Sequence, residues 1–217
     1  MRPASTSPAS ARWVRDRVQV RAFGPVAWFA DEVDDPIAWV AELNSRRIDG
    51  ITEIIPAERT VVVVCERERH GEIGSVVAEI DGSAAVVGSP GHQSIEVVYD
   101  GPDLAATADA LGLSVEELIR RHASATYTVA FCGFSPGFAY LRGLDPTLRL
   151  PRRTTPRTKV PAGSVAIAAG YSCVYPSSSP GGWHLLGRSD VRVFDVDRAE
   201  PALLRPGMTV SFTPTAG

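Results

Sequence analysis

The C-terminal half of the chain constrains the fold most, because helix signals end near Tyr127 and only short apolar runs follow. Gly, Pro and Ser turns separate these runs, and each run has the length of a β-strand. The runs are Tyr127–Cys132, Ser164–Ala169, Trp183–Leu186, Val191–Phe194 and Thr209–Phe212. Many short strands between Gly- and Pro-rich turns are typical of β-sandwiches and β-barrels. The sequence therefore predicts an all-β architecture after Tyr127.

One strand and two helices are expected just before this β region. Ile95–Tyr99 has strand character, and the stretches Asp103–Leu111 and Ser114–Ala123 have helical spacing, the second starting with a capping box. Ser89-Pro90-Gly91 has the composition of a linker, since the spacing of apolar residues and the composition both change after it. We therefore expect a second domain over residues 92–217.

The segment from residue 16 to residue 89 alternates between strand and helix patterns. The order of these patterns is β-β-α-β-β-α-β, which predicts a small α+β domain with helices on one face of a sheet. The expected elements are Val18–Phe23, Val26–Phe29, a helix from Asp35 to Asp49, Ile51–Ile55, Thr60–Cys65, a helix over Gly71–Ile80 and a last strand Ala84–Val87. Residues 1–15 are rich in Ser, Pro and Ala, which favours a disordered tail and leaves a transit peptide as the alternative.

Composition excludes several classes of protein. Of the 217 residues, 44% are apolar and 22% are charged, which is typical of a globular, core-forming chain. The longest β-branched run, Val61–Cys65, is far too short to span a membrane. A net charge of −3 predicts no attraction to nucleic acid or to an anionic membrane. Cys65, Cys132 and Cys173 form no paired motif, so we expect no disulfide framework, no metal site and a reducing, cytoplasmic location.

Positive charge is concentrated in one stretch of the β region. It contains Arg142, Arg149, Arg152, Arg153, Arg157 and Lys159 against only Asp145, and Lys159 is the chain's only lysine. Because residues two apart in an extended segment project to the same side, Arg157 and Lys159 are expected to converge on one anion. A solvated basic loop is the alternative interpretation of this stretch.

Several motifs in order along the chain carry a resemblance to a known family. They are YTVAFCGFSPGFAYL (127–141), GLD (143–145), PRR (151–153), PRTKVPAGSV (156–165), YP (175–176) and SPGGWHLLGR (179–188). This set resembles the family of 5-oxoprolinase B subunits, also called the allophanate hydrolase subunit 1 or KipI family, with carboxyltransferase subdomain C/D-like architecture. The resemblance covers about Ile95 to Phe212, and the N-terminal half fits by domain order.

The resemblance implies a fold, partners and an activity. It implies an α+β N-terminal domain followed by an all-β cyclophilin-like barrel with one or two helices. Family members work with two sister chains, a cyclophilin-like C subunit and an A subunit, in the ATP-dependent opening of 5-oxoproline to glutamate. ATP would then be shared with the partner subunits, with Mg accompanying it, and this chain alone would be inactive.

Candidate site residues follow from the basic stretch, the motifs and the aromatic residues near them. We expect catalytic roles for Lys159, Arg157 and His184, because opening a lactam through a phosphorylated carbonyl needs positive charge and a proton carrier. The candidate substrate- or anion-binding residues are Arg152, Arg153, Ser164 and Arg188. The candidate pocket wall is Phe134, Phe138, Tyr140, Tyr171 and Trp183. A structural role is the alternative for His184, and burial in the barrel core is the alternative for the aromatic residues.

The sequence departs from the family pattern at three positions, which keeps other functions open. Tyr171 and Cys173 stand where the family commonly has an amide and a glycine, and Ser178 stands where an acidic residue often precedes SPGGW. One alternative is a KipI-type regulatory protein that inhibits a histidine kinase. A second is a carboxyltransferase-like module acting on urea, allophanate or another amide, and a third, by barrel analogy, is a peptidyl-prolyl isomerase.

Overall fold

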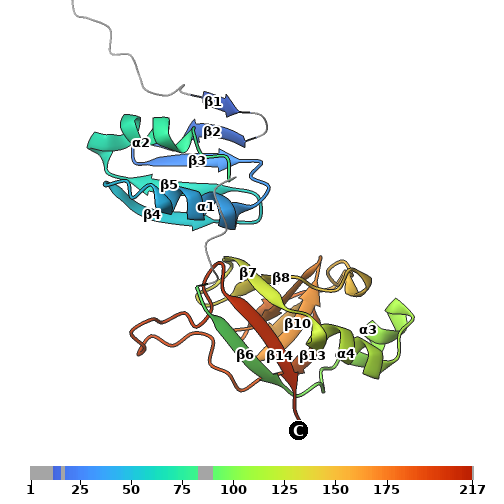
Figure 1. Ribbon diagram of the computed structural model, residues 1–217. Coiled ribbons are helices and arrows are strands. Elements are labelled where there is room, and N and C mark those ends of the chain that lie inside the picture. Colours follow the sequence, from blue (N-terminus) through green and yellow to red (C-terminus); the bar gives the residue numbers. More distant parts are fainter. Residues whose placement is uncertain (1–11, 16–17, 83–89, 217) are drawn as a thin grey trace, which may run out of the picture. The chain divides into compact units, whose positions relative to one another are not determined.

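The computed structural model describes residues 12–15, 18–82 and 90–216 (Figure 1). The chain divides into two compact units, residues 1–88 and residues 89–217. The predicted tail needs a correction, because Arg12–Arg15 form strand β1 rather than disordered chain. Residues 1–11 and the predicted strand Ala84–Val87 lie outside the described residues. Independent folding of the two units stays a prediction.

The first unit is an antiparallel sheet with two helices. The strands lie in the order β1 (Arg12–Arg15), β2 (Val18–Ala22), β3 (Ala27–Asp31), β5 (Val61–Cys65) and β4 (Ile51–Pro56). The helices are α1 (Pro36–Ser45), a short 3-10 turn η1 (Arg67–Arg69) and α2 (His70–Val77). Helix α1 begins where expected, because the Asp35 side chain accepts hydrogen bonds from two backbone amides and proline follows it. Both helices pack into one core with β5.

The second unit is mostly β, with two helices before its main strands. Its elements are β6 (His92–Val97), α3 (Leu104–Leu111), α4 (Val115–Ser124), β7 (Tyr127–Cys132), β8 (Ala139–Arg142), η2 (Pro146–Leu148), β9 (Arg157–Val160), β10 (Ser164–Ala168), β11 (Tyr171–Val174), β12 (Ser179–Gly181), β13 (His184–Arg188) and β14 (Thr209–Pro214). The predicted strand at Val191–Phe194 is wrong. Val193 is buried in the core, but the segment belongs to a long loop whose backbone forms only an isolated bridge at Phe194.

Seven strands of the second unit curl into a barrel, as predicted. Their order is β13-β10-β11-β8-β7-β14-β6, and β14 pairs in parallel with β6 (Figure 1). The outermost strands meet through two hydrogen bonds of 2.9 Å, from the Val98 amide to the Arg188 carbonyl and from the Arg188 amide to the Val98 carbonyl. Gly187 permits this approach, because a Cβ there would overlap the Val98 carbonyl oxygen.

A small ribbon of β9 and β12 covers one outer face of the barrel. Strand β10 is therefore buried on both faces. Val165 and Ile167 belong to the barrel interior, whereas Ala166 and Ala168 belong to a second cluster that also contains Trp183. This second cluster forms the floor on which the candidate site is built.

A chain of polar groups crosses the barrel interior at His122, which is fully buried. The Tyr99 hydroxyl lies 2.7 Å from His122 Nδ1, and His122 Nε2 lies 2.9 Å from Ser172 Oγ, which donates to the Ala166 carbonyl. A single arrangement of protons satisfies these bonds, with Tyr99 donating to Nδ1 and Nε2–H donating to Ser172. Burial lowers the pKa of His122 to about 3, so the imidazole is neutral.

One buried carboxylate joins the segments that carry the predicted basic residues. Asp103 is 4% exposed, and its oxygens accept hydrogen bonds from Arg153 (2.8 Å), from Arg157 (2.7 and 2.8 Å) and from the Leu185 amide (2.8 Å). Burial alone would raise the pKa of Asp103, but the hydrogen bonds from Arg157 and Leu185 and the two positive charges outweigh it and lower that pKa. A Cβ at Gly101 would overlap the Leu185 carbonyl oxygen, so glycine lets this loop reach β13.

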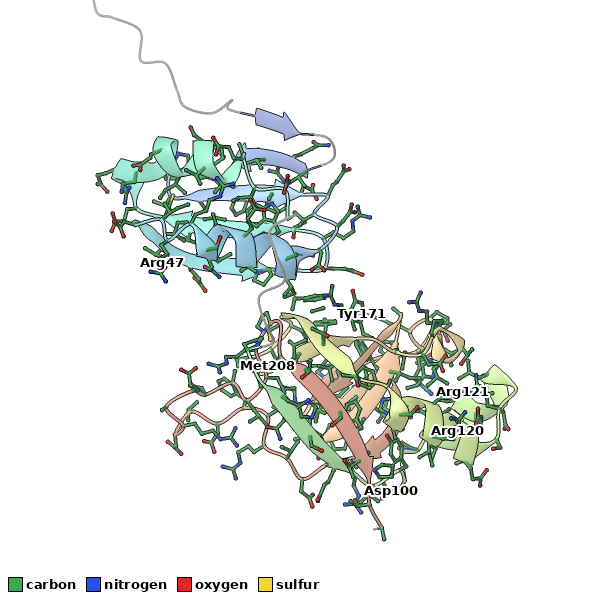
Figure 2. The ribbon with its side chains drawn as sticks, viewed as in Figure 1. Arg47, Asp100, Arg120, Arg121, Tyr171 and Met208 are labelled. Carbon is green, nitrogen blue, oxygen red and sulfur yellow. The ribbon has the colours of Figure 1, made fainter. Side chains whose placement is uncertain are left out.

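Replacing Asp103 tests how far the second unit depends on this carboxylate. Asp103→Asn should lower the free energy of unfolding by about 3 kcal/mol, because it leaves two partly buried guanidinium groups without their counter-charge. Asp100→Asn is the matched control. Asp100 is exposed and forms one ion pair with Arg188, so its loss should cost below about 1 kcal/mol (Asp100 is labelled in Figure 2). If urea denaturation gives equal losses of unfolding free energy for Asp103→Asn and Asp100→Asn, the role given to Asp103 is contradicted.

The buried imidazole should make stability depend on pH. The unfolded chain binds a proton at His122 below about pH 6.5, whereas the folded chain does not until about pH 3. Stability contributed by neutral His122 is therefore complete above pH 6.5 and falls as pH falls through this window, by up to about 1.4 kcal/mol per pH unit. Urea denaturation of the wild type and of His122→Gln between pH 6.5 and 5 should show a smaller slope for the variant. An NMR titration of the His122 ring with a midpoint near 6.5 would contradict this assignment.

Candidate functional site

The aromatic cavity is a hollow of about 70 Å³ on the outside of the barrel, beside β12. Four of the five predicted wall residues line it. The lining residues are Phe134, Phe138, Tyr140, Trp183, Tyr175, Arg152, Pro180, Gly181 and Gly182. Phe138 is the centre of the aromatic set, with its ring 5.3 Å from that of Tyr175 and 5.8 Å from that of Trp183, both edge to face.

Tyr175 lines the aromatic cavity in place of the predicted wall residue Tyr171. Tyr171 does not line the aromatic cavity; it lies behind Tyr140, edge to face at 5.8 Å (Tyr171 is labelled in Figure 2). Tyr175 does line it, and burial raises the pKa of its phenol above the usual range, so the hydroxyl stays protonated. The Tyr-Pro dipeptide at 175–176 was the only sequence signal for this residue, and it belonged to the motif rather than to a periodic pattern.

Phe134 stands at the mouth of the aromatic cavity in a strained conformation. Its φ is +71°, and the Ser135 amide donates to the Gly133 carbonyl at 2.9 Å, which makes Phe134 the central residue of a γ-turn with positive φ. The residue is 64% exposed, and its ring packs edge to face on that of Phe138 at 5.4 Å between ring centres. An exposed aromatic ring held in a costly backbone conformation is a feature found at ligand sites.

A second hollow, here called the basic cavity, adjoins the first and has a volume of about 360 Å³. It is lined by Ala110, Leu150, Pro151, Arg152, Arg153, Thr154, Thr155 and His184. Arg152 lines both cavities and is exposed. His184 Nε2 lies 2.9 Å from the Pro151 carbonyl, and because a carbonyl only accepts, Nε2 carries the proton and Nδ1 is the free acceptor. The structure thus brings Arg152, Arg153 and His184 together.

Of the four predicted cations in this stretch, two are paired with a carboxylate and two are not. Arg153 and Arg157 hold Asp103, so Arg157 does not converge with Lys159 on a free anion as expected. Lys159 is exposed and, like Arg152, makes no hydrogen bond or ion pair within the described part of the chain. Arg152 lines both cavities, whereas Lys159 and Arg157, both on strand β9, line neither. Unpaired positive charge at the cavities therefore comes from Arg152, with Lys159 on the neighbouring strand β9 as the other unpaired cation of this stretch among the described residues.

Two predicted anion-binding residues lie away from both cavities. Ser164 is buried and its hydroxyl donates to the Pro161 carbonyl at 2.9 Å, which is a structural use of that group. Arg188 is at the end of β13, where its Nε donates to Asp100 at 2.9 Å. Figure 2 shows Tyr171 and Asp100 at opposite ends of the barrel, so Arg188 is near the end remote from Tyr171.

The three residues that depart from the family pattern line neither cavity. Cys173 is fully buried in the cluster below the ribbon, and burial raises the pKa of its thiol. Ser178 is exposed and lines neither cavity. The residues described contain no cluster of His, Cys, Asp and Glu that could hold a metal ion. Among the same residues, every helix is too short or too polar to cross a membrane.

Proteins of known name are similar in sequence to most of this chain. The family model for the carboxyltransferase domain, subdomain C and D, matches residues 18–204. The B subunit of 5-oxoprolinase from Escherichia coli O157:H7 is 50% identical over 196 residues, covering 84% of this chain and 90% of the relative. The corresponding 5-oxoprolinase chain of Bacillus subtilis (strain 168), also named as the B subunit, is 33% identical over 221 residues, covering 90% and 92%.

Solved structures agree with the fold described above. The crystal structure of TTHA0988 is 34% identical with a TM-score of 0.75, covering 88% of this chain and 40% of its own. PH0987 from Pyrococcus horikoshii is 31% identical with a TM-score of 0.55, covering 90% and 97%. The K. lactis urea amidolyase, at 19% identity and a TM-score of 0.68 over 99% of this chain and 16% of its own, shows the fold alone. The chain therefore belongs to the family of 5-oxoprolinase B subunits, within the carboxyltransferase subdomain C and D fold.

Proposed function

We propose that this chain is the B subunit of an ATP-dependent 5-oxoprolinase and that it acts only with sister subunits. The relatives that are named as 5-oxoprolinase B subunits support the assignment to that enzyme. The observation that carries the proposal for the site is the aromatic cavity with Arg152 on its border. The proposed partners are a sister cyclophilin-like C subunit and an A subunit. The proposed compartment is the cytoplasm, where the free Cys65, Cys132 and Cys173 would stay reduced.

The chemistry of 5-oxoproline matches the two kinds of group at this border. The substrate is a small lactam with a planar amide and a carboxylate. Aromatic faces and edges from Phe134, Tyr140 and Trp183 suit the planar ring, and the exposed guanidinium of Arg152 suits the carboxylate through paired hydrogen bonds. The cavity would therefore orient the lactam, with its carbonyl toward the basic cavity.

The basic cavity has groups that suit a phosphate. Arg153 lines it, and its Nε is a buried donor that has no acceptor within the described residues, which a bound phosphate oxygen would supply. An unstrained lactam is a poor electrophile, and ATP would supply the phosphoryl group that activates its carbonyl oxygen. Arg152 and Arg153 from the cavity, and Lys159 from strand β9 outside its lining, would stabilise the negative charge that develops during this transfer.

The chain fits only part of the nucleotide. The sequence contains no Walker A motif, so the remaining contacts to ATP are assigned to the sister subunits. Neither cavity is lined by a carboxylate, so Mg accompanying ATP would take its ligands from phosphates, water and those sister chains. With Nε2 bonded to the Pro151 carbonyl, His184 would use Nδ1 to take a proton from the water that opens the ring.

Variants of the two unpaired cations test the proposal. In the complex reconstituted with its sister subunits, Lys159→Ala should lower kcat for ATP-dependent opening of 5-oxoproline by about 100-fold, the scale of one lost contact to a transition state. Lys159→Arg should recover only part of the rate, because a planar guanidinium does not occupy the position of an ammonium. Arg152→Ala should instead raise KM for 5-oxoproline by about 30-fold through loss of a charge-assisted hydrogen bond.

The matched control for these variants is Arg149→Ala. Arg149 is an exposed arginine of the same basic stretch that lines neither cavity and, unlike Lys159, lies outside the β9–β12 ribbon that borders the aromatic cavity. Its removal should change both constants less than about twofold. A wild-type complex with no ATPase response to 5-oxoproline would refute the proposed function. Wild-type activity in Lys159→Ala would remove the catalytic role of Lys159.

Phe134 should show opposite effects on stability and on substrate binding. Phe134→Gly relieves the positive φ and removes little buried surface, so the free energy of unfolding should stay constant or rise by about 1 kcal/mol. The same variant loses a wall of the cavity and should raise KM for 5-oxoproline by about tenfold. Phe134→Ala removes the ring but keeps the strain, so it should match the glycine variant in KM and be less stable in urea. A glycine variant that loses stability would contradict the strain argument.

A further inference from the structure

The barrel closes through a single residue pair, and this leaves part of β6 without a neighbour. Val98 pairs with Arg188, but the chain after Arg188 turns away into the loop that begins Ser189-Asp190-Val191. Within the described residues, strand β6 otherwise pairs only with β14. Its opposite edge therefore faces a gap beside this closure, here called the seam.

The hydrogen bonds at the two ends of the β6–β14 ladder show which backbone groups face the seam. The Thr209 amide donates to the Gly91 carbonyl and the Thr215 amide to the Val97 carbonyl, both at 2.9 Å. Odd-numbered residues of β6 thus bond to β14, and even-numbered residues turn their amides and carbonyls to the seam, as Val98 does. The Ser94 carbonyl accepts from the Gln93 side chain at 2.7 Å. Between Ser94 and Glu96, the groups without a hydrogen bond to the described part of the chain are therefore the two amides and the Glu96 carbonyl.

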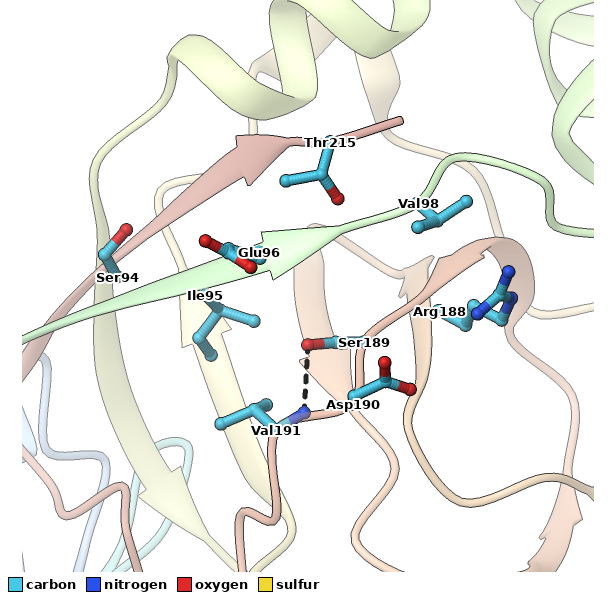
Figure 3. A pocket seen from close by; sticks show the side chains of 9 residues that line it. All are labelled: Ser94, Ile95, Glu96, Val98, Arg188, Ser189, Asp190, Val191 and Thr215. Carbon is cyan, nitrogen blue, oxygen red and sulfur yellow. Dashed lines mark hydrogen bonds between the residues drawn. The ribbon is translucent and has the colours of Figure 1, made fainter. Parts of the chain in front are cut away.

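A cavity of about 370 Å³ occupies the seam (Figure 3). Figure 3 shows Glu96 on β6 and Asp190 on the facing loop, on the two sides of this cavity. Both carboxylates are exposed and form no ion pair within the described residues, whereas the nearby Arg188 is paired with Asp100. Val98 and Val191 supply apolar surface. The seam cavity thus combines an open strand edge with uncompensated negative charge.

We propose that the seam cavity is the docking site for an extended, basic segment of a partner chain, which adds a short strand to the open edge of β6. An extended backbone presents N–H and C=O groups at the spacing that Ser94 and Glu96 require. A Lys or Arg side chain of that segment would lie between Glu96 and Asp190 and neutralise both. The open edge extends over about three residues, which limits the added strand to that length.

Strand addition also explains why an open edge is kept beside an otherwise closed sheet. Exposed edges with unpaired amides promote unspecific pairing, and proteins commonly cover them or block them. Here the cavity beside the edge has one acidic residue on β6, Glu96, and one on the facing loop, Asp190, which selects a basic segment and disfavours a second acidic edge. The inference rests on the proposed function only in requiring that the chain works in a complex with sister subunits.

Hydrogen exchange on the chain alone and on the reconstituted complex tests the docking site. The amides of Ser94 and Glu96 should exchange rapidly in the chain alone and at least about 100-fold more slowly in the complex. Glu96→Gln combined with Asp190→Asn changes no ladder bond and should weaken assembly about tenfold in calorimetry, with a smaller dependence on salt. The matched control is Asp197→Asn, an exposed carboxylate of the same loop outside the cavity, which should change affinity less than twofold.

Ser94→Pro provides a second test on the backbone itself. It removes an amide that faces the seam and no ladder hydrogen bond, so a folded variant should assemble about tenfold more weakly. A complex that opens 5-oxoproline while Ser94 and Glu96 exchange as in the free chain would overturn the docking site and leave the proposed function intact. A complex in which the amides of Ser94 and Glu96 are protected, but which does not open 5-oxoproline, would overturn the proposed function and leave the docking site intact. Failure to assemble with any sister chain would overturn the docking site as well.

Discussion

The second unit is organised around the carboxylate of Asp103. Its two oxygens receive donors from a loop at Arg153, from strand β9 at Arg157 and from strand β13 at Leu185. Both cavities depend on these segments, because Arg153 lines the basic cavity and β9 pairs with β12, which borders the aromatic cavity. A buried charge with complete hydrogen bonding is thus the contact that fixes loops of otherwise irregular structure.

The basic stretch illustrates why local charge is a limited guide to a binding site. From Arg142 to Lys159 the sequence predicts a concentrated positive field, yet two of its arginines are compensated by an aspartate about 50 residues earlier. Asp103 stands at the start of α3, where sequence rules assign an aspartate to capping, but its side chain makes no capping bond. Only the fold shows that this carboxylate serves a different segment. What remains for a ligand is a smaller and more selective charge on Arg152 and Lys159.

Sequence patterns predicted the architecture well wherever one side of an element is apolar and the other polar. β7 and the start of helix α1 agree with their predictions, since β-branched and aromatic residues or a capping aspartate mark them. The short strands β9 and β12 were not predicted, because their residues are mostly polar, Gly or Pro and pair only within a two-stranded ribbon. The predicted strand at Val191–Phe194 is wrong for the opposite reason. Its residues form an apolar run because Val193 is buried, but the run has no partner strand. Apart from Tyr171, the predicted wall residues line one cavity. Phe134, Phe138 and Trp183 lie on Gly- and Pro-rich loops that pack beside Tyr140 of strand β8.

The parallel pairing of β14 with β6 has a consequence for how the chain folds during synthesis. Of the seven barrel strands, β14 comes last along the chain, yet it lies between β6 and β7, the first two. Contacts such as that between His92 and Thr209, 117 residues apart, form only after nearly the whole unit has left the ribosome. Until then both early strands lack their neighbour and the interior stays open to water. Closure is thus a late, non-local event of high contact order, which makes folding of the barrel slow and leaves the growing chain dependent on protection from aggregation.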